Sequence, residues 1–176
     1  MVAESDRKER CAAPVALSWC LVLVWAAFIF FMSAHTGTDL DEGAGFAAQV
    51  KRWLSALAVA AVGSADAVSV AAHFLEYTVF GALLFAALFL TVRYREVRRR
   101  GSEAGVPAPG GRRLGLLVLG AMALASLYGA SDEFHQLSVP GRLCDPADWL
   151  TDTCGAALGA VLTACAVRRR KGGGRR

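Results

Sequence analysis

Tyr128–Gly155, with the sequence YGASDEFHQLSVPGRLCDPADWLTDTCG, decides the fold and locates the candidate site. Long apolar runs flank it on both sides, Leu114–Leu127 before and Gly155–Val167 after. Ionisable groups between two membrane-length runs are costly unless they are paired or functional. The stretch therefore predicts a functional site where two membrane helices meet. Its ionisable and amide side chains are Asp132, Glu133, His135, Gln136, Arg142, Asp145, Asp148 and Asp152.

The apolar residues, 55% of the 176 residues, fall in four blocks. About 20 consecutive apolar residues cross the hydrocarbon core as a helix. Because charges are confined to the joints between blocks, we predict an all-α integral membrane four-helix bundle and not a soluble one. The predicted spans are Pro14–Ala34, Val70–Val92, Leu114–Ala130 and Trp149–Val167. The chain then divides into a leader (residues 1–13), a four-span membrane domain (residues 14–167) and a basic tail (residues 168–176).

Lys and Arg are concentrated in alternate joints: before the first span, between the second and third, and after the fourth. Such asymmetry marks the cytoplasmic side of a membrane protein. We therefore expect a multi-pass protein of the cell membrane with both termini cytoplasmic and the stretch Tyr128–Gly155 facing outward. The basic clusters lie directly at span ends, so topology and anionic lipids explain them more simply than nucleic acid does.

The first outward loop, residues 35–69, contains apolar residues at helical spacing, including Phe46, Val50, Trp53 and Leu57. This pattern predicts a short amphipathic helix at the membrane interface, with Trp53 as its anchor. A solvent-exposed or re-entrant loop is the alternative.

The topology places the unusual polar residues of the spans at one depth, near the outer membrane face. His73, Glu76 and Tyr77 share a face in the first two turns of the second span. The third span ends, and the fourth begins, within the polar stretch. We therefore predict a single polar pocket that opens outward, or sideways into the outer leaflet. Its residues are His73, Glu76, Tyr77, Asp132, Glu133, His135, Gln136, Arg142, Asp148 and Asp152.

Local signals define the start of the fourth span. Asp145 is the predicted N-cap, and Asp148 is placed to be its capping-box acid. Asp152 lies one turn deeper, where a carboxylate needs a partner. Glu133 is expected to point away from Asp132, although it can meet Gln136. The candidate partners of Asp152 are Arg142, His135 and His73.

Small residues recur every four positions along the fourth span: Thr151, Gly155, Gly159 and Thr163. In lipid, this spacing lets a neighbouring helix pack closely against the small residues. The sequence does not say which helix that neighbour is.

Two His–carboxylate pairs, His73-x-x-Glu76 and Asp132-x-x-His135, have the i, i+3 spacing that holds metals in helix bundles. One hypothesis is therefore a hydrolase or transferase acting on a lipid-linked phosphate, in which a divalent metal activates water. No H-E-x-x-H motif supports it, and both histidines can instead donate to carboxylates in a non-catalytic network. The metal ligands of this alternative are His73, Glu76, Asp132, His135 and Asp152.

Two motifs carry a family resemblance: HFLEYTVFG at His73–Gly81, and YGASDEFHQLSVPGRLCDPADWLTDTCGAALG at Tyr128–Gly159. With FFMSAHTG at Phe30–Gly37, they make residues 15–167 similar to the VanZ-like family of small membrane proteins. One departure is the segment Ser69–Ala72, which lacks the basic residues that related sequences carry before the histidine of the second helix.

The resemblance implies a cell-envelope protein linked to lowered teicoplanin sensitivity, an antibiotic-resistance trait. Its outward pocket would bind a lipid head group, a cell-wall precursor or a glycopeptide, without catalysis and without a cofactor. Its expected partners are membrane lipids and a lipid-linked or glycopeptide small molecule, and not nucleic acid.

Overall fold

The computed structural model describes residues 2–34, 49, 53, 56, 59–60, 66–101, 106, 109–139 and 144–172. These residues form an all-helical structure, and no strand occurs among them. Four helices are long and apolar enough to cross a membrane. The prediction of an all-α chain with four spans is therefore confirmed. The helices are α1 (Val2–Ser33), α4 (Asp66–Arg100), α5 (Gly111–Gln136) and α6 (Pro146–Gly172).

The helices extend beyond the predicted apolar spans. The second predicted span ends at Val92, whereas α4 continues to Arg100 through an arginine-rich run. Arg and Glu are good helix formers, so the hydrogen-bonded backbone continues where the apolar sequence stops. Arg113 Nη1 donates to Glu96 Oε2 at 2.7 Å and ties the start of α5 to the end of α4.

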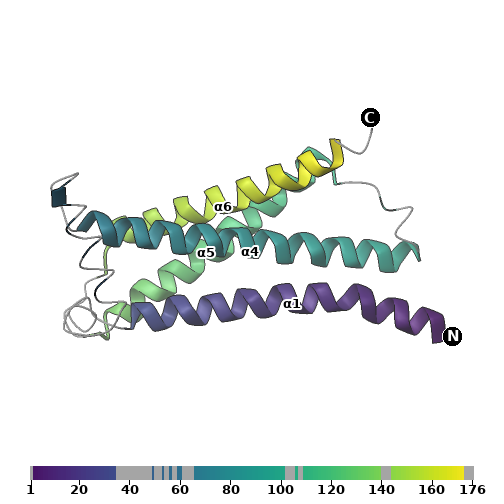
Figure 1. The fold of residues 1–176 in the computed structure, drawn as a ribbon, viewed down its shortest axis with the longest axis horizontal. Helices are drawn as coiled ribbons and strands as arrows, with labels where there is room; N and C mark the ends of the chain where they lie inside the picture. Colours follow the sequence, from purple (N-terminus) through teal and green to yellow (C-terminus); the bar gives the residue numbers. More distant parts are fainter. Residues whose placement is uncertain are drawn as a thin grey trace.

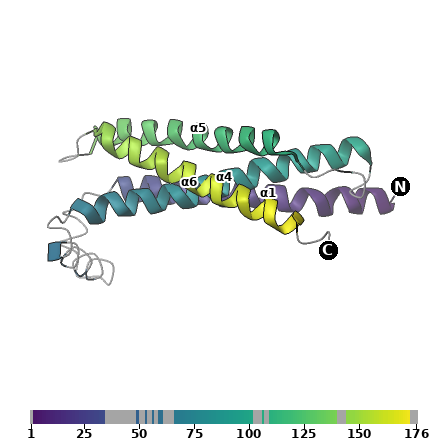
Figure 2. The same ribbon diagram turned by 90° about the horizontal axis from the view of Figure 1, so that it is seen from above.

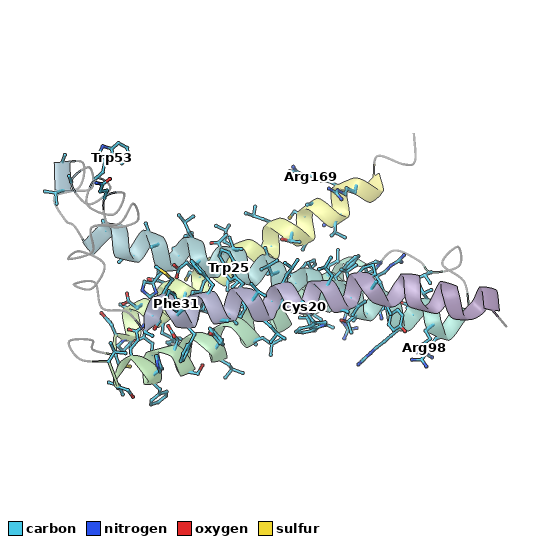
Figure 3. The ribbon with its side chains drawn as sticks, turned by 60° about the horizontal axis from the view of Figure 1, so that its bottom comes forward. Cys20, Trp25, Phe31, Trp53, Arg98 and Arg169 are labelled. Carbon is cyan, nitrogen blue, oxygen red and sulfur yellow. The ribbon has the colours of Figure 1, made fainter. Side chains whose placement is uncertain are left out.

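The four helices alternate in direction along the bundle (Figures 1 and 2). The start of α1 and the end of α6 lie toward the end where α4 ends and α5 begins, and Arg98 and Arg169 mark that end in Figure 3. Phe31 and Trp53 mark the opposite end, where α1 and α5 end and α4 and α6 begin. The predicted interfacial helix lies largely outside the described residues. The elements bearing the polar stretch therefore share one end of the bundle, as the topology requires.

Glycines bring the backbones of α4 and α6 together. A Cβ atom on Gly159 would overlap the carbonyl oxygen of Thr78 on α4, and one on Gly155 would overlap that of Phe74. Gly81 of α4 is equally restricted, because its Cβ would meet the Ala156 carbonyl oxygen. The close packing predicted from the small-residue repeat is confirmed, and the partner helix is α4.

Side-chain donors attach α1 to the other helices. Trp19 Nε1 donates to Thr91 Oγ1 of α4 at 3.0 Å, and Tyr128 Oη of α5 donates to the Ala26 carbonyl oxygen at 2.6 Å. Large apolar side chains on the outer faces stay exposed, with Leu17 and Leu116 62% and 61% accessible. Exposed apolar surface of this kind suits contact with lipid acyl chains.

The α4–α6 contact predicts a clear difference between glycines. Gly159→Ala should lower the free energy of unfolding by about 1–3 kcal/mol, because the methyl group forces the two backbones apart. Gly115→Ala is the matched control, since nothing lies within 4 Å of its added Cβ on α5. It should leave stability unchanged or raise it by up to about 1 kcal/mol through helix propensity. Thermal unfolding of the detergent-purified variants measures both effects, and equal losses would contradict close α4–α6 packing.

Candidate functional site

Three helices meet at Gly129 of α5. A Cβ atom on Gly129 would lie 3.4 Å from Tyr77 Oη of α4 and 3.5 Å from Asp152 Oδ2 of α6. Tyr77 is fully buried, and Asp152 is 1% exposed. The missing side chain at position 129 therefore lets a phenol and a carboxylate from two other helices approach the same side of α5.

His73 is the described partner of Asp152. Its Nδ1 atom lies 3.3 Å from Asp152 Oδ1, within ion-pair distance when the imidazole is protonated. His73 stands one turn before Tyr77 on α4, so both side chains lie on the same face of that helix. Of the three partners predicted for Asp152, the structure brings His73 to it. The carboxylate is nearly inaccessible, whereas 13% of the His73 side chain remains exposed.

Asp132 and Gln136 form a second buried contact at the end of α5. Gln136 Nε2 donates to Asp132 Oδ2 at 3.3 Å, and the two residues are only 1% and 3% exposed, respectively. The buried hydroxyl of Ser33, at the end of α1, lies beside Asp132. His135 packs its ring against Phe30 of α1, with centroids 4.2 Å apart. The end of α1 therefore covers this side of the polar residues.

Glu133 has a role that the sequence analysis did not predict. It is 3% exposed, and its Oε2 accepts the Asp145 backbone N–H at 2.8 Å. Asp145 is confirmed as the N-cap of α6, because its Oδ1 accepts the Ala147 N–H at 2.8 Å. The capping-box role assigned to Asp148 is wrong: an acid from α5 takes the N-cap N–H instead. Glu133 therefore faces α6, and not a separate face of the bundle.

Glu76 and Asp148 form the half-buried edge of the site. The charge of Glu76 interacts with those of His73, Asp132 and Asp152. Asp148 interacts electrostatically with the same His73 and Asp152. The indole of Trp25 donates to the Glu76 carbonyl oxygen at 3.0 Å and holds α1 against α4 at this level.

These side chains form one polar cluster at the end of the bundle marked by Phe31 (Figure 3). Many of its buried atoms have no hydrogen-bond partner within the described part of the chain. A buried polar group without a partner costs about 1–3 kcal/mol, so native proteins contain few. Such atoms gathered in one place mark a candidate binding site. The polar cluster comprises Ser33, His73, Glu76, Tyr77, Asp132, Glu133, His135, Gln136 and Asp152. Apart from His73 Nδ1 and Asp152 Oδ1, which face each other at 3.3 Å, its atoms without partners are Ser33 Oγ, Tyr77 Oη, Asp132 Oδ1, Glu133 Oε1, His135 Nδ1 and Asp152 Oδ2.

The arrangement does not favour the metal-dependent alternative. Across the described ranges, no three His, Cys, Asp or Glu side chains are arranged to hold a metal ion. His135 lies against Phe30, whereas His73 pairs with Asp152. The two His–carboxylate pairs therefore do not combine into a single ligand set. Arg142, the remaining predicted pocket residue, lies outside the described residues.

Gly129 is the site residue that sequence reasoning missed. It carries no functional group, so a search for ionisable residues passes over it. Its position three residues before Asp132, on the same side of the helix, was the available signal. Phe30 was overlooked for a similar reason, because an apolar residue in an apolar span is unremarkable until its contact with His135 is seen.

The fold and the polar cluster define a class of small multi-pass helical membrane protein with acids and histidines buried at one end of the bundle. Comparison with known families matches residues 18–167 to VanZ/LLP1. The chain belongs to this family, and the VanZ-like resemblance is confirmed. No curated protein and no solved structure matches the chain significantly.

The His73–Asp152 contact predicts energetic coupling. His73→Ala should lower the free energy of unfolding by about 1–3 kcal/mol, because it leaves the buried carboxylate without its partner. In the Asp152→Asn background the same change should cost less, with a coupling energy of about 0.5–3 kcal/mol. Chemical unfolding in detergent micelles measures the cycle. Ser131→Ala, an exposed hydroxyl bonded to its own helix, is the control. Additive effects of the two substitutions would show that the pair is not coupled.

Proposed function

We propose that this VanZ/LLP1 family member is a non-catalytic protein of the cell envelope that binds the head group of an envelope lipid or of a lipid-linked cell-wall precursor. The observation that carries the proposal is the set of buried polar atoms without partners around Asp152 and Tyr77. Burying a polar group without a hydrogen-bond partner costs free energy, and such groups persist in an apolar bundle when a ligand completes their interactions. Their position near the end of the spans corresponds to the depth of lipid head groups.

The proposed orientation places both termini in the cytoplasm and the polar cluster at the outer face of the cell membrane. It is supported by the arginines near the opposite end of the helices, including Arg98 and Arg169 (Figure 3). Basic residues next to spans stay on the cytoplasmic side. Outward-facing head groups, cell-wall precursors and glycopeptides all become accessible to the cluster in this orientation.

Cys144 provides a test of this orientation. It is exposed at the polar-cluster end, just before Asp145. A membrane-impermeant maleimide applied to intact cells should label the wild-type protein and fail to label Cys144→Ser. Labelling that persists in Cys144→Ser and disappears in Cys11→Ser would reverse the orientation and place the cluster on the cytoplasmic side.

Ligand retention tests the function itself. Native mass spectrometry of the purified protein should show a retained lipid or lipid-linked molecule. Asp152→Asn should reduce this retention at least ten-fold, because it removes the charge at the centre of the cluster. Ser131→Ala should retain as much as the wild type. Identical profiles for Asp152→Asn and wild type would refute binding at the cluster.

We also propose that the protein lowers sensitivity to teicoplanin, and this part of the proposal is tested separately by measuring the inhibitory concentration. Expression of the wild type in a teicoplanin-sensitive host should raise the inhibitory concentration, and Asp152→Asn at equal membrane abundance should not. Unchanged sensitivity with the wild type would remove teicoplanin from the proposal while leaving head-group binding standing.

A further inference from the structure

The polar cluster carries more acids than bases. Glu76, Asp132, Glu133 and Asp152 come together from three helices, and their charges interact with one another. Within the described ranges, the basic groups at this end are the two histidines of the cluster. Every described Lys and Arg belongs to the start of α1, the end of α4, the start of α5 or the end of α6, all near the opposite end. The described part of the cluster therefore lacks a permanent positive charge.

Two of the buried atoms without partners border the same glycine. Asp152 is 1% exposed and Tyr77 is fully buried, yet Tyr77 Oη and Asp152 Oδ2 have no described hydrogen-bond partner, whereas Asp152 Oδ1 faces His73 Nδ1. Tyr77 Oη and Asp152 Oδ2 both border Gly129, where no side chain intervenes. Asp132, one turn further along α5, interacts electrostatically with both Tyr77 and Asp152. Acceptors from three helices are therefore presented to the same region.

The chemistry of these groups selects the kind of ligand. A primary ammonium group carries one positive charge and three N–H donors, which match two carboxylates and a phenol oxygen. Charge-assisted N–H···O⁻ bonds form at about 2.7–2.9 Å. A divalent metal needs several oxygen ligands converging at about 2.0–2.6 Å, and no such group occurs in the described part of the chain. A quaternary ammonium lacks the donors, and a purely anionic head group would be repelled by the acids.

The surroundings favour a lipid over a free amine. Phe134, Leu137 and Trp149 lie next to the cluster in sequence and are 73%, 58% and 41% exposed. Such apolar surface beside a polar site suits acyl chains that accompany a head group. His73 and Glu76 are half-buried and form the accessible edge of the cluster, where His73 lies beside Asp152.

We infer that the polar cluster binds the primary ammonium group of a phosphoethanolamine lipid head group, with Asp152, Asp132 and Tyr77 Oη as its acceptors. This inference rests on the proposed function and makes it specific, because it names the charged group that the cluster recognises. The phosphate of the same lipid lies farther from the acids, on the side of the accessible edge.

Three short-chain phospholipids with identical acyl chains test the inference: those with ethanolamine, choline and glycerol head groups. Binding to the full-length protein in detergent is measured by native mass spectrometry or by the shift in melting temperature. The ethanolamine lipid should bind at least ten-fold more tightly than the other two. Tyr77→Phe, which keeps the ring, and Asp152→Asn should each reduce that preference at least three-fold. Ser131→Ala should leave it unchanged.

The remaining outcomes separate the inference from the broader proposal. If the glycerol lipid binds more tightly than the ethanolamine lipid, and Asp152→Asn abolishes that binding, the inference of an ammonium ligand is overturned. The proposal that the cluster binds a head group would still stand. Equal binding of all three lipids, unaffected by Asp152→Asn, would overturn both. If free ethanolamine competes as well as the lipid does, the ligand is a soluble amine and not a lipid.

Arg142 offers an internal alternative to the ligand, because its guanidinium could supply the missing positive charge. A preference for the ethanolamine lipid that appears only in Arg142→Ala would assign the counter-ion to Arg142 and overturn the inference for the wild-type chain. A wild-type preference that Arg142→Ala leaves intact supports the ammonium ligand.

Discussion

The backbone contact between α4 and α6 is the constraint on which the rest of this structure depends. Gly81, Gly155 and Gly159 let the two helices approach until carbonyl oxygens occupy the space of side chains. Asp152 lies one turn from Gly155 on α6, and Tyr77 one turn from Gly81 on α4. Close approach at the glycines therefore brings the polar side chains one turn away into contact. The same feature that packs the bundle in lipid also assembles the site.

The site itself reflects the cost of polar groups in an apolar bundle. In water, exposed acids would be hydrated and would need no partner. Here Asp132, Glu133 and Asp152 are almost inaccessible, and the helices around them turn apolar faces outward. Glu133 is accounted for structurally, because it caps α6 from α5. Asp152 is paired with His73 through Oδ1, whereas Asp152 Oδ2 and Tyr77 Oη are buried without a hydrogen-bond partner in the described part of the chain.

Much of the fold could be predicted from the sequence, because its signals are long-range and simple: blocks of apolar residues and arginines at alternate joints. The gathering of polar residues at one end followed from the alternation of span directions. The sequence could not show that His73, among three candidates, meets Asp152, or that Glu133 replaces Asp148 as the partner of the N-cap. Both outcomes depend on the rotation of each helix about its axis, which is set by the contacts at Gly129 and Gly155. Periodicity alone leaves that rotation undetermined.

The separation of arginines and acids along the bundle also has an electrical consequence. With the proposed orientation, a membrane potential negative inside draws the arginine-rich end toward the cytoplasm and the acidic end outward. Moving one elementary charge through 100 mV involves about 2.3 kcal/mol. The resting voltage of a living cell would therefore oppose any vertical displacement of the bundle, and hold Asp132 and Asp152 at a constant height against the outer leaflet.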